Sequence, residues 1–323
     1  MSFINLIENK IHVGTNQKFV SIIGSNPSKG ARSPALWNKA FFNLKINMKM
    51  FPLDVKDKYI GKLVKSLKKN KNFYASAVTI PHKEKIIKYL DEIDQPALEI
   101  GSVNLIVKEK NKIKGYNTDS LGFLYTLNKI NKKIKNLLII GCGGAGKACI
   151  VATKNKYPKT NIYLFNRNTS KLIKFYKKIK INKKNIKIIK NYKNLQGLNK
   201  LDLIINTTKL GFDMEISKIK SNFKYFSPIS KSEIKFDKLK TVEKISNSIT
   251  NNLIETLAFL KVNSNAFIFD IIYKPAKTML MKIGEKIGMK SINGLEMNYM
   301  QAVEAFKIVN KKISLKKIIY AMK

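Results

Sequence analysis

The chain has 323 residues, with 62 Lys and Arg against 21 Asp and Glu and a formal net charge of +41. This length allows about two domains, and a hydrophobic content of 44% is that of a globular protein. No apolar stretch reaches the roughly 18 residues of a membrane span, and the first residues lack the pattern of a secretory signal, so we expect a cytoplasmic protein.

A net charge this high is typical of proteins that bind nucleic acids or membranes. The lysines are, however, spread along the whole chain together with abundant Asn and Ile, whereas a binding arm concentrates its basic residues in one tail or face. The sequence therefore predicts weak, salt-sensitive attraction to polyanions, but no specific nucleic-acid partner and no membrane partner. A nucleic-acid-binding protein on a dinucleotide-binding fold stays open as a remote alternative.

The first 120 residues predict strands that alternate with helices. Apolar runs bounded by turn residues predict three strands, over 19–23, 48–53 and 74–80. Pro34 suits the first turn of a helix. Helical spacing of apolar residues predicts a second helix through Ile60, Leu63, Val64 and Leu67. Residues 103–108 and 112–116 predict a hairpin around Lys110-Asn111, and a further helix begins at Asp119.

The remainder of the chain predicts a parallel sheet. Five apolar runs, alternating with helices, are expected to be its strands: 137–140, 162–165, 186–189, 203–205 and 267–270. Residues 213–262 are predicted as an insertion between two strands, helical in part over 242–260. A helix is expected from about 295 to 309, and another near the C-terminus.

A glycine-rich turn, GCGGAGKA over 141–148, follows the first of these five strands. Gly141, Gly143 and Gly144 lack Cβ atoms, so the backbone N–H groups can approach a pyrophosphate at a helix N-terminus. The next apolar run ends in Asn166-Arg167, and an Arg at this point suits a 2′-phosphate where an acidic residue would hold a ribose hydroxyl. A bare strand-to-helix turn without a ligand is the alternative interpretation.

Cysteine and histidine residues give no sign of a metal site. The two cysteines, Cys142 and Cys149, match neither a zinc pattern nor a redox pair, so we expect reduced packing residues. The two histidines, His12 and His82, are too few to form a metal site by themselves. No metal is expected.

Polar segments beside turn signals are the other candidate functional sites. They are 26–34, 76–85, 101–104, 115–120 and 293–302. Each alone has an ordinary explanation: Lys83 as a surface lysine, Asp119 as a helix cap, and Gln301 as a solvated helix residue.

Taken together and in order, these segments resemble the shikimate dehydrogenase family. The matching pieces are SP (33–34), VTIPHKE (78–84), GSVN (101–104), NTD (117–119), GCGGAGKA (141–148), NRNTSK (166–171), DLIINTT (202–208), DIIYKPAKTML (270–280) and NGLEMNYMQA (293–302). The resemblance implies an α/β protein of two domains. An N-terminal α/β substrate domain, residues 1–120 completed by C-terminal helices over 291–323, would precede a Rossmann-like NADP-binding domain over 121–290. The substrate crevice is expected between them.

The resemblance also implies an activity and a set of site residues. A reduced nicotinamide cofactor, NADPH, would pass hydride to the ketone of 3-dehydroshikimate and form shikimate. Lys83 would be the catalytic acid/base, with Asp119 beside it. The substrate pocket would be completed by Ser33, Thr79, Asn104, Tyr273 and Gln301. The cofactor would be held by Gly141, Cys142, Gly143, Gly144, Ala145, Asn166, Arg167, Lys171, Ile271 and Gly294. The partner is then a small molecule, and the protein a monomer or a homodimer.

The chain departs from the family pattern at several positions. The loop that holds the substrate carboxylate has Ala31 where the family has a first serine, so a charge-assisted hydrogen bond worth about 1.5–3 kcal/mol is lost. Backbone N–H groups, Lys29 or Arg32 are the candidates to compensate. The other departures are Ala77, Ser120, Asn168 and Met279. A dehydrogenase for quinate or another cyclic hydroxy acid, and an inactive relative, remain alternatives.

Overall fold

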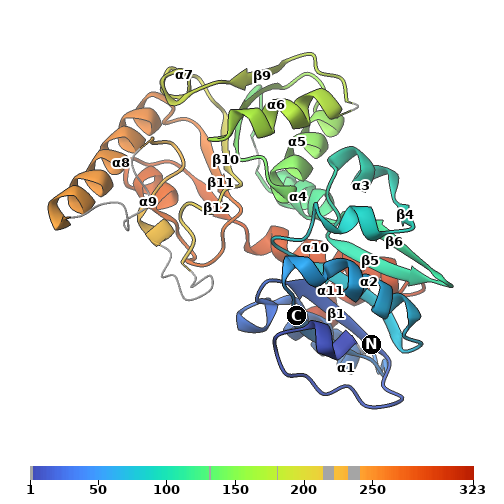
Figure 1. Cartoon of the computed structure of the whole chain (residues 1–323). Coiled ribbons are helices and arrows are strands. Elements are labelled where there is room, and N and C mark those ends of the chain that lie inside the picture. The colour runs from blue at the N-terminus through green and yellow to red at the C-terminus, as the bar shows by residue number, and fades with distance from the viewer. Residues whose placement is uncertain (1–2, 131, 180, 214–221, 232–240) are drawn as a thin grey trace. The chain divides into compact units, whose positions relative to one another are not determined.

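The computed structural model describes residues 3–130, 132–179, 181–213, 222–231 and 241–323. The chain forms two compact units, one of residues 1–123 with 298–323 and one of residues 124–297 (Figure 1). Two helices, α4 (Asp119–Asn128) and α10 (Leu295–Val309), begin in one unit and end in the other. The expected domain boundaries, 120/121 and 290/291, lie three and seven residues before these divisions.

The first unit contains a six-stranded mixed sheet. Its strand order is β2-β1-β3-β5-β6-β4, with bounds β1 Phe19–Gly24, β2 Lys49–Asp54, β3 Phe73–Val78, β4 Glu92–Ile93, β5 Leu105–Glu109 and β6 Lys112–Tyr116. Strands β2, β1 and β3 are parallel, while β5 is antiparallel to β3 and β6. The predicted hairpin is confirmed as β5–β6, and Lys110 takes a positive φ of 54° in its turn.

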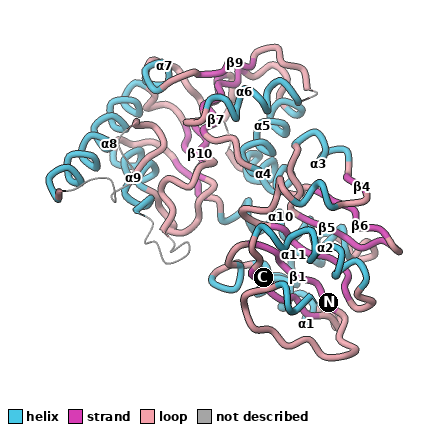
Figure 2. Tube along the Cα trace, in the orientation of Figure 1, coloured by secondary structure: helices cyan, strands magenta, loops and turns pink. Residues whose placement is uncertain are grey.

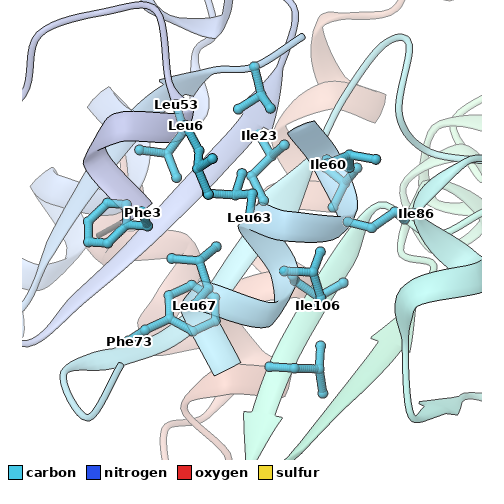
Figure 3. Close-up of a cluster of buried hydrophobic side chains, with 14 of the residues drawn as sticks. Phe3, Leu6, Ile23, Leu53, Ile60, Leu63, Leu67, Phe73, Ile86 and Ile106 are labelled. Carbon is cyan, nitrogen blue, oxygen red and sulfur yellow. The ribbon is translucent and has the colours of Figure 1, made fainter. Parts of the chain in front are cut away.

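Helices cover both faces of this sheet (Figure 2). On one face lies α2 (Ile60–Lys69), whose four predicted apolar residues are all buried in a cluster that also holds Phe19. Figure 3 shows Ile60, Leu63 and Leu67 of this helix together with Phe3 and Phe73 of the same cluster. On the other face lie α1 (Ser33–Asn43), α11 (Leu315–Met322) and the C-terminal part of α10. Trp37 of α1 packs edge-on against Phe306 of α10, with ring centroids 5.0 Å apart. The short helix α3 (Gln95–Ile100) precedes β5.

The second unit is built on a parallel sheet of the order β12-β11-β10-β7-β8-β9. Its strands are β7 Asn136–Ile140, β8 Asn161–Phe165, β9 Ile186–Ile189, β10 Leu203–Asn206, β11 Phe267–Asp270 and β12 Ser291–Asn293. This is the doubly wound order of dinucleotide-binding folds, in which ligands bind beyond the carboxyl ends of the strands, where the order reverses. Here that point lies between β7 and β10. The five predicted strands are confirmed.

Helices also cover both faces of this second sheet. They are α5 Gly144–Lys156, α6 Thr169–Lys178, α7 Tyr192–Gln196, α8 Val242–Val262 and α9 Met279–Lys286. Leu138 and Ile140 of β7 pack with α8 and α9 in one cluster, while the alternating residues Leu137 and Ile139 are fully buried on the opposite side. Both faces of the strand are therefore apolar, as in sheets covered on two sides.

The helix predicted over 242–260 is confirmed as α8 (Val242–Val262). It lies in the segment predicted as an insertion, but it connects β10 to β11 and contributes Phe259 and Leu260 to the core. The rest of that insertion includes residues 214–221 and 232–240, which lie outside the described residues. Strand β12 belongs to the second sheet, although it falls inside the segment assigned to the substrate domain. A four-residue 3₁₀ helix, Ile86–Tyr89, follows Lys83.

Candidate active site

The turn after β3 holds Lys83 in the first unit. Thr79 N donates to Ile23 O at 2.8 Å, which continues the pairing of β3 with β1 past the end of the strand. Val103 N donates to Lys83 O at 2.8 Å, which ties the same turn to the segment before β5. The neighbouring His82 is fully buried, and its Nε2 lies 2.9 Å from Val55 O. Burial lowers the pKa of His82, so this buried contact stabilises the turn without adding a charge beside Lys83.

Asp119 begins α4 and lies against Lys83. Lys83 Nζ is 2.6 Å from Asp119 Oδ2, and the two side chains are 18% and 6% exposed. Asn117 fixes the backbone at the start of α4, because its Oδ1 accepts from Asp119 N at 3.0 Å and its Nδ2 donates to Ser102 O at 2.8 Å. The expectation that the amine and the carboxylate converge is thus met within one unit, 36 residues apart in the chain.

Asn104 connects this pair to α10. Its Nδ2 lies 2.9 Å from Asp119 Oδ1, 3.0 Å from Thr118 Oγ1 and 3.2 Å from Gln301 Oε1. Its Oδ1 accepts from Thr118 N at 2.8 Å, and Thr118 Oγ1 donates to Gln301 O at 2.8 Å. We call Lys83, Asn104, Thr118, Asp119 and Gln301 the lysine–aspartate cluster. An ammonium held by a carboxylate among amides and hydroxyls can donate a proton and bind a hydroxyl-rich molecule.

Ser33 and Thr79, two predicted substrate residues, lie in the same unit, and Thr118 is a member of the cluster that the sequence analysis missed. Ser33 begins α1 and Thr79 follows β3, but within the described ranges no hydrogen bond joins their hydroxyls to the lysine–aspartate cluster. Thr118 was not predicted as a site residue. Its contact with Gln301, 183 residues away in the chain, depends on the placement of α10, which no local sequence pattern indicates.

In the second unit, three glycines give the turn after β7 its shape. Gly141 has a φ of +113°, and a Cβ there would lie 2.4 Å from Thr207 Oγ1. At Gly146 a Cβ would lie 2.6 Å from Gly141 O, whereas a Cβ at Gly143 would meet no atom within 4 Å. These are the three roles of the G-x-G-x-x-G pattern: a tight turn, an open approach for pyrophosphate, and close helix packing. Gly146 was missed as the third glycine, although the spacing is present in the sequence.

The start of α5 fits an anion. Among the described residues, no side chain caps the helix at Gly143, so the first N–H groups, including those of Gly144 and Ala145, remain for a phosphate. Cys142 N donates to Asn166 Oδ1 at 3.1 Å, which links the glycine turn to the end of β8.

The residues after β8 fit a second phosphate group. Arg167 and Lys171 are exposed, and Asn168 Oδ1 accepts from Lys171 N at 2.9 Å as the cap of α6. Asn166 uses both ends of its amide, because its Nδ2 donates to Asn168 O at 2.7 Å. It therefore orders the loop that carries the two cations. Two exposed cations beside a glycine turn match a nucleotide with a 2′-phosphate.

Comparisons with known proteins agree with this arrangement. Residues 22–106 match the family described as shikimate dehydrogenase substrate binding domain. The chain is 33% identical over 286 residues to the shikimate dehydrogenase (NADP(+)) of Halothermothrix orenii, with 87% of each chain covered. This chain belongs to the shikimate dehydrogenase family.

Solved structures of the family have the same fold. The crystal structure of shikimate dehydrogenase from Aquifex aeolicus is 26% identical, with a TM-score of 0.71, and the match covers 97% of this chain and all of that one. A shikimate dehydrogenase in complex with NADP⁺ is 27% identical, with a TM-score of 0.70, and 96% of each chain is covered. Among the residues that the structure describes, no helix is long and apolar enough to cross a membrane, and no group of three or more His, Cys, Asp or Glu side chains could hold a metal ion.

Within this family member, a buried carboxylate that the sequence did not single out lies at the ends of β10 and β11. Asp270 is fully buried, and Asn206 Nδ2 donates to both of its oxygens at 3.1 and 3.0 Å. Ile272 N and Thr278 Oγ1 donate to it at 3.0 and 2.7 Å. Burial nevertheless raises the pKa of Asp270 to about 6.

This carboxylate holds the loop that carries the predicted nicotinamide and substrate residues. Ile271 and Tyr273 follow Asp270 directly. Gly294 N donates to Ile272 O at 3.1 Å, and a Cβ at Gly294 would lie 1.8 Å from Ile271 O. The structure thus brings Ile271 and Gly294 together, and only a glycine allows this approach.

Proposed function

We propose that this protein catalyses the reversible, NADPH-dependent reduction of 3-dehydroshikimate to shikimate. The observation that carries the proposal is the contact between Lys83 and Asp119 beside the amides of Asn104 and Gln301. The names of its relatives, shikimate dehydrogenase (NADP(+)), support the same activity.

Lys83 is the proton donor in this proposal. When bound, NADPH supplies the hydride that reduces the ketone. The ketone oxygen then gains negative charge, and the ammonium of Lys83 both stabilises this charge and delivers the proton from its Nζ. In the reverse direction, the neutral amine accepts the proton from the hydroxyl.

Asp119 and the surrounding amides position the substrate and the lysine. The Asp119 carboxylate orients the Lys83 ammonium, and its two oxygens can also accept from substrate hydroxyls. Asn104 and Gln301 offer further donors and acceptors, and we assign Ser33, Thr79 and Tyr273 to the same substrate. A polyol needs this density of polar groups because a hydroxyl left without a partner in a closed site weakens binding.

The second unit is proposed to bind NADP(H). Gly141, Cys142, Gly143, Gly144 and Ala145 would hold the pyrophosphate. Asn166, Arg167 and Lys171 would select the 2′-phosphate. Ile271 and Gly294 would contact the nicotinamide. We place the reaction in the shikimate pathway to the aromatic amino acids and in the cytoplasm, a reducing compartment in keeping with the buried free thiols of Cys142 and Cys149.

Lys83→Ala tests this proposal. The wild type should oxidise shikimate with NADP⁺, and loss of the acid/base should lower kcat by about 10²–10⁴-fold with an unchanged far-UV circular dichroism spectrum. Lys85→Ala is the matched control, because Lys85 is exposed, pairs with Asp57 and lies two residues away; its kcat should stay within about twofold of wild type.

Two results would contradict the proposal. Equal activity of Lys83→Ala and Lys85→Ala would remove Lys83 from catalysis. A higher kcat/KM for quinate than for shikimate would show that the substrate is wrong, which is the alternative raised by Ala31.

A further inference from the structure

The side-chain amide of Asn104 has fewer hydrogens than the acceptors that surround it. Its Nδ2 lies 2.9 Å from Asp119 Oδ1, 3.0 Å from Thr118 Oγ1 and 3.2 Å from Gln301 Oε1. The orientation of the amide is fixed, because Asn104 Oδ1 accepts from Thr118 N at 2.8 Å. Two N–H donors therefore face three acceptors, and one of the three acceptors is left for another donor.

The hydroxyl of Thr118 is able to accept one of these two hydrogens. Thr118 Oγ1 donates its own hydrogen to Gln301 O at 2.8 Å, a shorter contact than the 3.3 Å to Asn104 Oδ1. The lone pairs of the hydroxyl then remain for Asn104 Nδ2. Thr118 thus contacts both ends of the Asn104 amide, with its backbone N–H at the oxygen and its hydroxyl at the nitrogen.

The acceptor left over is Oε1 of Gln301. It is the most distant of the three from Asn104 Nδ2, and it competes with a carboxylate oxygen of Asp119, which accepts more strongly because it is charged. Gln301 is also half-buried, whereas Asn104 and Thr118 are 3% and 0% exposed. Among these three residues, Gln301 is therefore the one that a ligand can reach.

A hydroxyl of a bound polyol can donate to this oxygen without a loss elsewhere. When the hydroxyl takes Gln301 Oε1, the two hydrogens of Asn104 stay with Asp119 and Thr118. Without the Thr118 hydroxyl, the second hydrogen of Asn104 would have Gln301 Oε1 as its one remaining partner in the cluster. An arriving hydroxyl would then compete with a buried N–H group, and a buried donor without a partner weakens binding.

We propose that Thr118 is a positioning residue that leaves Gln301 Oε1 available to accept a hydrogen bond from a hydroxyl of the substrate; this inference rests on the proposed function. Thr118 acts through Asn104 and needs no contact with the substrate. Because Oε1 can only accept, the site prefers a hydroxyl over an ether oxygen at this position of the substrate ring.

Thr118→Val tests the proposal, because valine keeps the branched shape and removes the hydroxyl. The KM for shikimate, measured with NADP⁺, should rise by about 5- to 20-fold. The Kd for shikimate, measured by titration calorimetry without cofactor, should rise by the same factor. Because the contact of Lys83 with Asp119 Oδ2 does not involve Thr118, kcat should change less than about threefold.

Two other substitutions at this position make the test specific. Thr118→Ser keeps a hydroxyl that donates and accepts, so its KM should stay within about twofold of wild type. Thr118→Cys has a thiol, a weak donor and acceptor, and its KM should lie between those of wild type and Thr118→Val. The cysteine variant also provides the measurement if the valine variant does not fold.

Thr256→Val is the matched control for the loss of a buried hydroxyl. Thr256 is fully buried, and its Oγ1 donates to a backbone carbonyl, that of Asn252, at 2.7 Å. It lies in α8 of the second unit. Its replacement should lower the free energy of unfolding in urea as Thr118→Val does, but the KM for shikimate should stay within about twofold of wild type.

A double-mutant cycle with Gln301→Met shows whether Thr118 acts through Gln301. This variant removes Oε1 and should itself raise the KM for shikimate. In its background, Thr118→Val should raise KM by less than about twofold further, because no acceptor remains there for the substrate hydroxyl. Two effects on KM that simply multiply would overturn the proposal.

The outcomes separate this inference from the proposed function. A wild type that does not turn over shikimate would refute the proposed function. If wild type turns over shikimate and Thr118→Val has the same KM, only the role of Thr118 is refuted. A KM in Thr118→Ser as high as that in Thr118→Val would also refute this role, because the effect would then not depend on the hydroxyl.

Discussion

Replacing Asp270 by Asn should change how the stability of the protein depends on pH. Burial raises the pKa of Asp270 from 3.8 to about 6, against the hydrogen bonds from Asn206, Ile272 and Thr278. The folded protein therefore keeps a proton on this carboxyl at pH values where the unfolded chain has released it. Since the folded state binds more protons in this range, the free energy of unfolding falls as the pH rises from about 4 to about 6.

The size of this effect follows from the two pKa values. One pKa unit corresponds to about 1.4 kcal/mol, so ionised Asp270 lowers the free energy of unfolding by about 3 kcal/mol at neutral pH. Asp270→Asn has nearly the same shape and does not titrate. The difference in unfolding free energy, wild type minus variant, should therefore decrease by about 2.4 kcal/mol between pH 4 and pH 7, because part of the total change occurs below pH 4.

Urea unfolding of the cofactor-free protein, followed by far-UV circular dichroism at constant ionic strength, measures this difference. Thr278→Val is a matched comparison, because it removes a hydrogen bond that favours the charged form. Loss of this bond should raise the pKa of Asp270 further, so the free energy of unfolding of Thr278→Val should keep falling up to a higher pH than that of wild type. A difference that stays constant, or that increases with pH, would refute the reasoning.

Two predictions concern the proposed cofactor site. Arg167→Asp should raise the KM for NADPH by at least about tenfold and that for NADH far less, because only NADPH has the 2′-phosphate; equal changes in steady-state kinetics would remove the assignment. Gly146→Ala should destabilise the apoprotein by about 1–3 kcal/mol in urea unfolding, since the new Cβ would lie 2.6 Å from Gly141 O. In Gly143→Ala the new Cβ would meet no atom within 4 Å, so the free energy of unfolding should be unchanged while NADPH binding weakens. A larger loss of stability in Gly143→Ala than in Gly146→Ala would contradict the roles assigned to the two glycines.

Much of the fold could be predicted because its strands are continuous apolar runs. Strands such as β7 and β10 are buried on both faces, and the alternation of these runs with helices indicated a parallel sheet. The short strands β4 and β12 have two and three residues, too few to show a periodicity, so they were missed. Helix α8 was predicted over 242–260 but assigned to an insertion, because its polar residues Asn252 and Thr256, which are buried with hydrogen bonds, interrupt the apolar face of a core helix.

The candidate site could be predicted only in part from the residues themselves. Lys83 and Asp119 were selected through a resemblance, and their contact results from the pairing of β3 with β5 and of β5 with β6. Asp270 lies at the end of a predicted strand, and its two hydrogen bonds from Asn206 form only when β10 and β11 lie side by side.

The packing of Trp37 against Phe306 has a consequence for synthesis of the chain. Trp37 is the single tryptophan, and its neighbours Phe306, Ile318 and Met322 come from the last helices. On the ribosome, the amino-terminal half leaves the exit tunnel long before these residues are made, whereas the second unit is one continuous segment. The second unit can therefore fold before the first, although it is synthesised later than residues 1–123. The fluorescence of Trp37 should report the moment at which the last helices pack against the N-terminal residues.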